Sequence, residues 1–183
     1  MNGTDLDYDF EFIENGRTIE VISAGFATDD GSTYYAINRD LDLAQLADNP
    51  WLMANVVPTL PLTAGSDASG RFVAWDPDKA DFDKVKPLAQ IADEVRAFIL
   101  QAPGPRRLWA DYGAYDHVAL CQLWGSMIDL PDGIPMWTHD LRQEIERLGL
   151  TDADLPQQAS GRHNALADAL HNRTVRRNLA SRP

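Results

Sequence analysis

Alternating acidic and aromatic side chains near the N-terminus are the feature that most limits the fold of this chain. In the stretch LDYDFEFIENG (residues 6–16), Asp7, Asp9 and Glu11 lie two residues apart, with aromatic residues between them. A period of two predicts a β-strand that has its acids on one face and its aromatics on the other. The Asn-Gly pair that ends the stretch is a strong hairpin signal, so this strand begins an antiparallel pair.

The rest of the chain predicts two more strands of this sheet and then a series of helices. Residues 18–28 and 32–38 complete a three-stranded antiparallel meander. Pro, Gly and Ser predict a loop at 58–70, and an acidic surface loop follows at 75–83. We assign no role to residues 58–83. The remaining expected elements are helices at 41–57 (interrupted before Pro50), 85–100, 115–125, 138–149 and 163–179, and a fourth strand at 106–112.

This order of elements predicts an α/β fold with a mixed sheet. We place the fourth strand beside the first, reached through the 85–100 helix, so that the first strand is central and helices cover its acidic face. A carboxylate in such a place is costly unless it is paired or binds a metal ion. Because no Lys or Arg alternates with these acids, a metal ion is the preferred partner. The length of 183 residues suggests one domain.

Composition restricts the partners and the compartment. The formal net charge of −12 disfavours a protein that coats nucleic acid through general electrostatics. It is compatible with a nuclease whose acidic cluster is neutralised by metal ions. The single cysteine, Cys121, excludes an intrachain disulfide and favours a reducing cytoplasm. We see no apolar leader and no run long enough to span a bilayer, so we expect a cytoplasmic protein without a membrane partner.

Two more acids lie where they could meet the first strand. Asp116 follows Gly-Ala-Tyr just after the fourth strand, and Asp168 lies five residues after His163 near the start of the last helix. Each has a simpler interpretation when it is taken alone. Asp116 could be a helix N-cap, Asp168 an ordinary helix acid, and Asp9 and Glu11 part of a solvated strand face.

Together, these motifs resemble the DEDDh family of 3′–5′ exonucleases, in the ribonuclease H-like superfamily. More narrowly, EFIENGRTIEVIS and GAYDHVALCQLWG resemble the small bacterial exoribonucleases related to ribonuclease T. The resemblance implies a ribonuclease H-like fold, with three antiparallel strands followed by parallel strands and flanked by helices. It also implies a single exonuclease domain over residues 1–183. The residues that carry the resemblance are Asp9 and Glu11 in DFEFIE, Asp116 in GAYDHVAL, and His163 and Asp168 in HNALADA.

The same resemblance implies a two-metal mechanism, and the residue types fit that chemistry. Oxygen ligands favour Mg²⁺ or Mn²⁺, two of which can hydrolyse a phosphodiester bond. By resemblance, Asp9 should bridge both ions, and Glu11 and Asp168 should complete the site of the ion that activates water. Asp116 should support the other ion. His163 should be the general base, because imidazole titrates near neutral pH.

The substrate implied by the resemblance is the 3′ end of single-stranded RNA, released as nucleoside 5′-monophosphates. The alternatives are a 3′–5′ exodeoxyribonuclease and a non-catalytic nucleotide-binding module, and related enzymes are often homodimers. Phe12 and Ile13 should pack against the terminal nucleotide, although Phe12 could equally belong to the core. Tyr115 and Arg162 are further candidates for nucleotide contacts.

Three other reactive residues are expected to have structural roles. Asp7 shares the face of Asp9, but we expect it beyond the ions and nearer solvent. Asp111 is expected to support the site from the fourth strand. Cys121 is surrounded by apolar residues and is expected to be a buried thiol.

Overall fold

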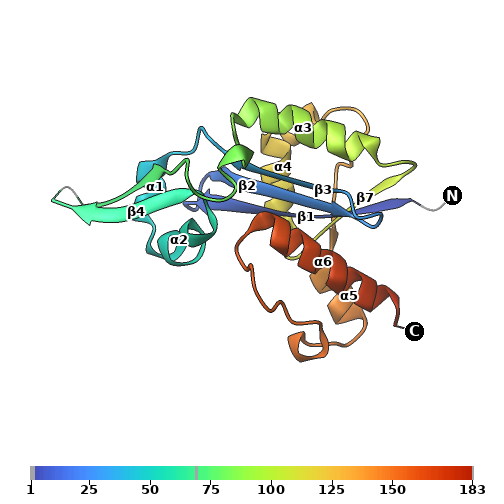
Figure 1. The fold of residues 1–183 in the computed structure, drawn as a ribbon. Helices are drawn as coiled ribbons and strands as arrows, with labels where there is room; N and C mark the ends of the chain where they lie inside the picture. Colours follow the sequence, from blue (N-terminus) through green and yellow to red (C-terminus); the bar gives the residue numbers. More distant parts are fainter. Residues whose placement is uncertain (1–2, 69, 183) are drawn as a thin grey trace.

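A computed structural model of the chain describes residues 3–68 and 70–182 (Figure 1). Residues 1, 2, 69 and 183, which the predicted domain includes, lie outside the described residues. The centre is a six-stranded mixed sheet with the order β6-β3-β2-β1-β7-β8. Its strands are β1 (Thr4–Glu14), β2 (Ile19–Thr28), β3 (Thr33–Asn38), β6 (Val85–Lys86), β7 (Arg106–Ala110) and β8 (His139–Asp140).

The pairing of these strands matches the prediction. β1, β2 and β3 form the antiparallel meander, while β7 pairs with β1 in parallel and places β1 inside the sheet. Helices cover both faces (Figure 1): α3 (Leu88–Gln101) and α4 (Ala114–Gln122) pack on one, and α5 (Leu141–Arg147) and α6 (Ala165–Ala180) on the other. The expected α/β architecture is therefore confirmed. Among the described residues, no helix combines the length and apolarity needed to cross a bilayer.

The alternation along β1 separates a hydrophobic core from a polar face. Tyr8 and Phe10 are buried with Phe26 of β2, under α3 and α4. Asp7 and Glu11 point the other way, toward α6 and the segment that precedes it. Between Glu11 and the next residue, the pairing with β2 shifts by one residue. Such a bulge bends the strand beside the polar face.

Two predicted elements are different in the structure. The expected loop at 58–70 contains β4 (Leu62–Asp67), which pairs with β5 (Gly70–Trp75) as a hairpin that projects from the body (Figure 1). The Pro, Gly and Ser residues of this segment predicted a loop by composition, but antiparallel pairing with β5 makes Leu62–Asp67 a strand. The expected helix at 85–100 begins only at Leu88, because a residue before proline disfavours helical geometry and Pro87 follows β6.

The other differences concern where helices begin. The predicted 41–57 segment contains α1 (Leu43–Asp48), α2 (Pro50–Asn55) and a 3₁₀ turn (Val57–Thr59), so the break before Pro50 is confirmed. The predicted 138–149 helix starts after the short strand β8. The last helix begins at Ala165 rather than at His163, since the side chain of Asn164 accepts a hydrogen bond from the Ala167 N–H at 3.1 Å and caps α6.

Candidate active site

All five predicted catalytic residues line one cavity of about 370 Å³. Asp9 and Glu11 come from the middle of β1, Asp116 from the first turn of α4, and Asp168 from the first turn of α6. His163 lies just before α6. The sheet thus brings together residues that are more than a hundred positions apart in the chain, and this position is the one that the motifs predicted.

Asp116 is fixed against β1 by a backbone hydrogen bond. Its Oδ1 accepts from the N–H of Phe10 at 2.8 Å, and the residue is buried. The N-cap of α4 is Gly113, so the simpler interpretation of Asp116 as a helix cap is wrong. Burial raises the pKa of Asp116 to about 7. The carboxyl group therefore faces the cavity beside Asp9 and not solvent.

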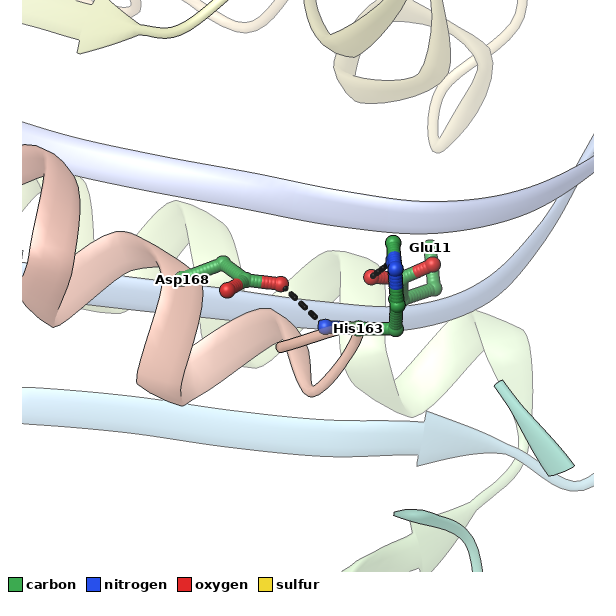
Figure 2. Close-up of side chains that lie close together, drawn as sticks. All are labelled: Glu11, His163 and Asp168. Atoms are coloured by element: carbon green, nitrogen blue, oxygen red, sulfur yellow. Dashed lines mark hydrogen bonds and ion pairs between the residues drawn. The ribbon is translucent and has the colours of Figure 1, made fainter. Parts of the chain in front are cut away.

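The segment before α6 holds His163 and Asp168 together (Figure 2). The Asp168 carboxylate accepts from the His163 N–H at 2.8 Å and from the Gln158 amide at 2.6 Å. Thr59 donates to the His163 carbonyl at 2.8 Å. His163 has a φ of +63°, a left-handed backbone geometry that is uncommon outside glycine and costs free energy unless neighbouring contacts fix it. Its Nδ1 lies 4.0 Å from Oε1 of Glu11.

The cavity concentrates negative charge. Burial and the neighbouring carboxylates raise the pKa of Glu11 to about 8, and the same causes raise the pKa of Asp9 well above its ordinary value. Burial also raises the pKa of Asp168. Among residues 3–68 and 70–182, no Lys or Arg forms a salt bridge with Asp9, Glu11, Asp116 or Asp168.

This donor set fits divalent cations. Ligand atoms of Glu11, His163 and Asp168 lie within 4.8 Å of one another, and carboxylate oxygens are the ligands that Mg²⁺ and Mn²⁺ prefer. A bound cation would also offset the burial and the mutual repulsion that raise these pKa values. The residues present are therefore suited to the metal chemistry that the sequence motifs imply.

The raised pKa values predict how metal-free protein responds to pH. A carboxyl group has a pKa near 4 in an unfolded chain, while Asp116 and Glu11 titrate near 7 and 8 when folded. At a pH between the unfolded and the folded pKa values, folded protein binds more protons than unfolded protein. Its free energy of unfolding should therefore fall as pH rises from about 5 to about 8. In EDTA, the melting temperature should drop by roughly 5 °C or more over this range.

Cation binding should flatten that dependence, because cations replace the protons. Melting curves at several pH values, with EDTA or with Mn²⁺, would measure both effects. Glu11→Gln should lose part of the slope, whereas Glu14→Gln, at the exposed end of the same strand, should keep it. A stability that is constant or rising over this pH range in EDTA would contradict the prediction.

Three of the four predicted nucleotide-contact residues lie at the cavity. Phe12 and Tyr115 stack with their ring centroids 6.0 Å apart, and both line the cavity together with Arg162. Tyr115 is 53% exposed, so its ring is available to a base. Ile13 is different: it is buried in the core beside Ile22, and its position does not support the predicted nucleotide contact.

The structure adds residues that the sequence patterns did not single out. Trp51, at the start of α2, is 54% exposed and places its ring edge-on to His163, with centroids 4.9 Å apart. Gln158 donates to Asp168 from a Gln/Ser/Gly loop that showed no periodic signal. Asn172 also lines the cavity, and its spacing of four residues from Asp168 was the available signal.

The acids expected to be structural have clear partners. Asp7 is fully buried and forms an ion pair with Arg176, so the expectation that it lies nearer solvent is wrong. Asp111 accepts two hydrogen bonds from Arg142, at 2.6 and 2.7 Å, and borders the cavity. Cys121 is buried, as predicted.

Comparisons with known proteins point to one family. The model of the 3′-5′ exoribonuclease Rv2179c-like domain matches residues 4–180. The 3′-5′ exoribonuclease Rv2179c of Mycobacterium tuberculosis strain H37Rv is 37% identical over 163 residues, covering 88% of this chain and 84% of the relative. The 3′-5′ exoribonuclease MT2234.1 of strain CDC 1551 gives the same values.

A solved structure supports the fold. The Mg²⁺- and Mn²⁺-bound form of S. pombe Pop2p superposes with a TM-score of 0.52 at 13% sequence identity. The match covers 98% of this chain and 84% of Pop2p. A likeness at this level of identity concerns the fold alone, and it agrees with the α/β fold and mixed central sheet predicted from the order of elements.

Proposed function

Because the chain belongs to the Rv2179c-like family of 3′-5′ exoribonucleases, we propose that it shortens single-stranded RNA from the 3′ end and releases nucleoside 5′-monophosphates. The resemblance inferred from the motifs is thereby confirmed at the level of the family. The single observation that carries the proposal for this chain is the convergence of Asp9, Glu11, Asp116, His163 and Asp168 on one cavity.

The four carboxylates would hold two divalent cations, Mg²⁺ or Mn²⁺. Asp9 would contribute to both, Glu11 and Asp168 to one, and Asp116 to the other. The charges support a pair of ions, since four ionised carboxylates and two dications sum to zero. When bound, such ions supply positive charge at the scissile phosphate and lower the pKa of water. The Mg²⁺ and Mn²⁺ bound to S. pombe Pop2p are consistent with this choice.

His163 would act as the general base. Its imidazole faces the cavity beside Glu11, and its backbone is held on both sides by Thr59 and Asp168. Attack of water on phosphorus breaks the bond to the 3′ oxygen of the penultimate nucleotide. His163 accepts the proton lost by the water, and the departing 3′ oxygen takes up a proton. The products are a nucleoside 5′-monophosphate and RNA shortened by one residue.

The terminal nucleotide would lie at the aromatic side of the cavity. Stacking on the Phe12–Tyr115 pair would tolerate every base, because each base has an aromatic face. Arg162 would contact phosphate through its guanidinium group. We further propose that residues 1–183 form a single exonuclease domain. Cytoplasmic location and homodimer formation stay predictions, and a size measurement in solution would test the latter.

The test is a degradation assay with matched oligonucleotides. Purified protein is incubated with a 5′-labelled oligoribonucleotide and the corresponding oligodeoxyribonucleotide, in Mg²⁺, Mn²⁺ or EDTA. We expect a ladder that shortens from the 3′ end, faster cleavage of RNA than of DNA, and no cleavage in EDTA. Shortening from the 5′ end, or inactivity with both ions, would reject the proposal. Faster cleavage of DNA than of RNA would favour the alternative of a 3′–5′ exodeoxyribonuclease. Nucleotide binding without turnover would favour the alternative of a non-catalytic binding module.

A further inference from the structure

Three polar residues lie on a single face of α6, and two of them contact β1. Asp168, Asn172 and Arg176 are four residues apart, a spacing that aligns side chains along a helix. Asp168 lies at the active-site cavity, and Asn172 donates to the backbone carbonyl of Tyr8 at 3.2 Å. Arg176 reaches the carboxylate of Asp7. The helix therefore follows the strand away from the site, and Asn172 and Arg176 contact β1 on successive turns.

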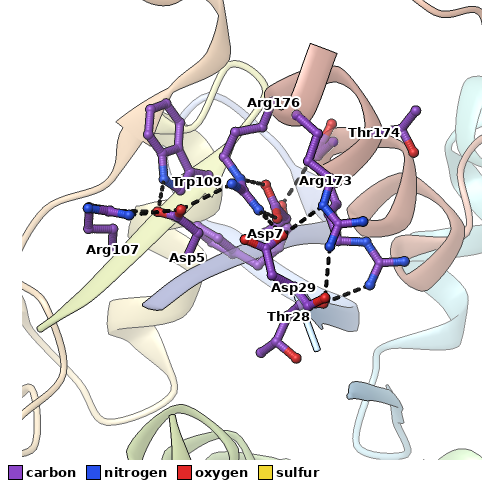
Figure 3. Close-up of polar contacts among 12 residues, drawn as sticks. Asp5, Asp7, Thr28, Asp29, Arg107, Trp109, Arg173, Thr174 and Arg176 are labelled. Atoms are coloured by element: carbon purple, nitrogen blue, oxygen red, sulfur yellow. Dashed lines mark hydrogen bonds and ion pairs between the residues drawn. The ribbon is translucent and has the colours of Figure 1, made fainter. Parts of the chain in front are cut away.

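The last of these contacts is a buried, bidentate ion pair. Arg176 Nε and Nη2 donate to the two carboxylate oxygens of Asp7 at 2.8 and 2.7 Å, and both side chains are at most 8% exposed. Two parallel hydrogen bonds fix both the angle and the distance between the guanidinium group and the carboxylate, and so between α6 and β1. A single charge contact fixes neither. Arg176 also donates to Asp5 at 3.1 Å and to Asp29 at 2.7 Å (Figure 3).

The wider cluster explains how this charge is tolerated. Asp5 also accepts from Arg107 and Trp109 (Figure 3). Asp29 accepts from Arg177 as well. The cluster thus pairs three carboxylates with three guanidinium groups, those of Arg107, Arg176 and Arg177. Arg176 donates to all three carboxylates. Arg176 does not line the active-site cavity. Its position therefore favours a role through α6 over a direct contact with RNA.

The two hydrogen bonds that orient the Asp168 carboxylate do not come from β1. The two groups that orient its carboxylate, the Gln158 amide and the His163 N–H, belong to the segment directly before α6. Because this segment is joined directly to α6, it would move together with the helix. The two donors therefore orient the Asp168 carboxylate but do not set its distance from β1. Arg173 donates to the carbonyl of Thr28, at the end of β2. Along α6, the side-chain hydrogen bonds to β1 come from Asn172 and Arg176.

We propose that Arg176 is a positioning residue for the metal site: by holding α6 in register with β1 through Asp7, it sets the separation of Asp168 from Asp9 and Glu11. This inference rests on the proposed function, because it assumes that these carboxylates bind cations together. The competing role is charge neutralisation alone, in which any cation beside Asp7 would suffice. Lysine separates the two roles, since it keeps the charge but has no planar fork for bidentate bonding.

The experiment measures Mn²⁺ binding by calorimetry in the absence of RNA. Arg176→Lys should weaken Mn²⁺ affinity by about 10- to 100-fold, the range seen when groups that orient metal ligands are changed, while cooperative unfolding persists. The matched control is Arg177→Lys, the next residue, whose half-exposed side chain binds Asp29. It should keep wild-type affinity within about twofold. Wild-type Mn²⁺ affinity in Arg176→Lys would overturn the inference.

Two further measurements separate positioning from stability. In Arg176→Lys, kcat for RNA should fall while KM changes less than about twofold, because the residue is remote from the cavity. The double variant Asp7→Leu/Arg176→Met removes the pair, and apolar replacement of buried ion pairs often restores stability. We expect its melting temperature to recover while Mn²⁺ affinity stays weak. Recovery of both would assign the pair to stability alone and overturn the inference.

Failure of the proposed function gives a different result. If the wild-type protein binds Mn²⁺ without hydrolysing RNA, the function is rejected and the comparison between Arg176→Lys and Arg177→Lys still decides the positioning role. If the wild-type protein binds no Mn²⁺, the metal site is rejected, and the positioning inference is overturned with it.

Discussion

Replacing Asp9 by asparagine should reduce RNA hydrolysis by a factor on the order of 10³ to 10⁶, the range produced by loss of a central catalytic group. Asp9 is the carboxyl group on which the site converges. It lines the cavity with Asp116, Glu11 and Asp168, and burial together with the charges of these three acids raises its pKa well above the ordinary value. Asparagine keeps the shape of the side chain but removes the charge that attracts cations. Initial rates in Mg²⁺ would measure the loss.

The same substitution should stabilise the metal-free protein, because it removes one of four mutually repelling groups. Melting curves in EDTA should therefore shift upward in Asp9→Asn while activity disappears. Asp93→Asn is the matched control, since Asp93 is exposed on α3, on the other face of the sheet. It should leave both rate and melting temperature unchanged. Activity of Asp9→Asn within tenfold of wild type would show that Asp9 is not a central ligand.

The polar face of β1 was predictable because its signal is local. A period of two places Asp9 and Glu11 on one face, and motif order brings Asp116 and Asp168 to the same edge. The partner of Asp7 had no such signal. Arg176 lies 169 residues further along the chain, and it approaches Asp7 only because α6 crosses the sheet at β1. Three acids that look equivalent in sequence therefore divide into two residues that line the active-site cavity and one ion-pair partner.

Local backbone geometry explains the other errors. We predicted that the last helix begins at His163, yet Asn164 caps that helix and leaves His163 in a left-handed conformation. Composition cannot distinguish a loop from a strand whose Gly and Ser residues are paired, as in β4. Trp51 gave no signal, because its proximity to His163 is created by tertiary packing.

Replacing Gly25 by alanine should impair stability and activity together. Gly25 lies opposite Asp9 in the β1–β2 pair, and a Cβ atom at this position would lie 2.2 Å from the backbone carbonyl oxygen of Ala165. Backbone atoms at the start of α6 would have to move away from the sheet. Overpacking of this kind typically costs about 1–3 kcal/mol. Urea unfolding should report a loss of this size.

The displaced helix would carry Asp168 with it, and a misplacement of about 1 Å can cost on the order of 10²-fold in rate. We therefore expect hydrolysis of RNA to fall by roughly this factor in Gly25→Ala, with weaker Mn²⁺ binding. Gly65→Ala is the matched control: the three atoms nearest its Cβ would belong to the ring end of the exposed Phe72 in the β4–β5 hairpin, which can turn aside. If Gly25→Ala keeps wild-type stability and rate, close contact between β2 and the first turn of α6 is not what positions Asp168.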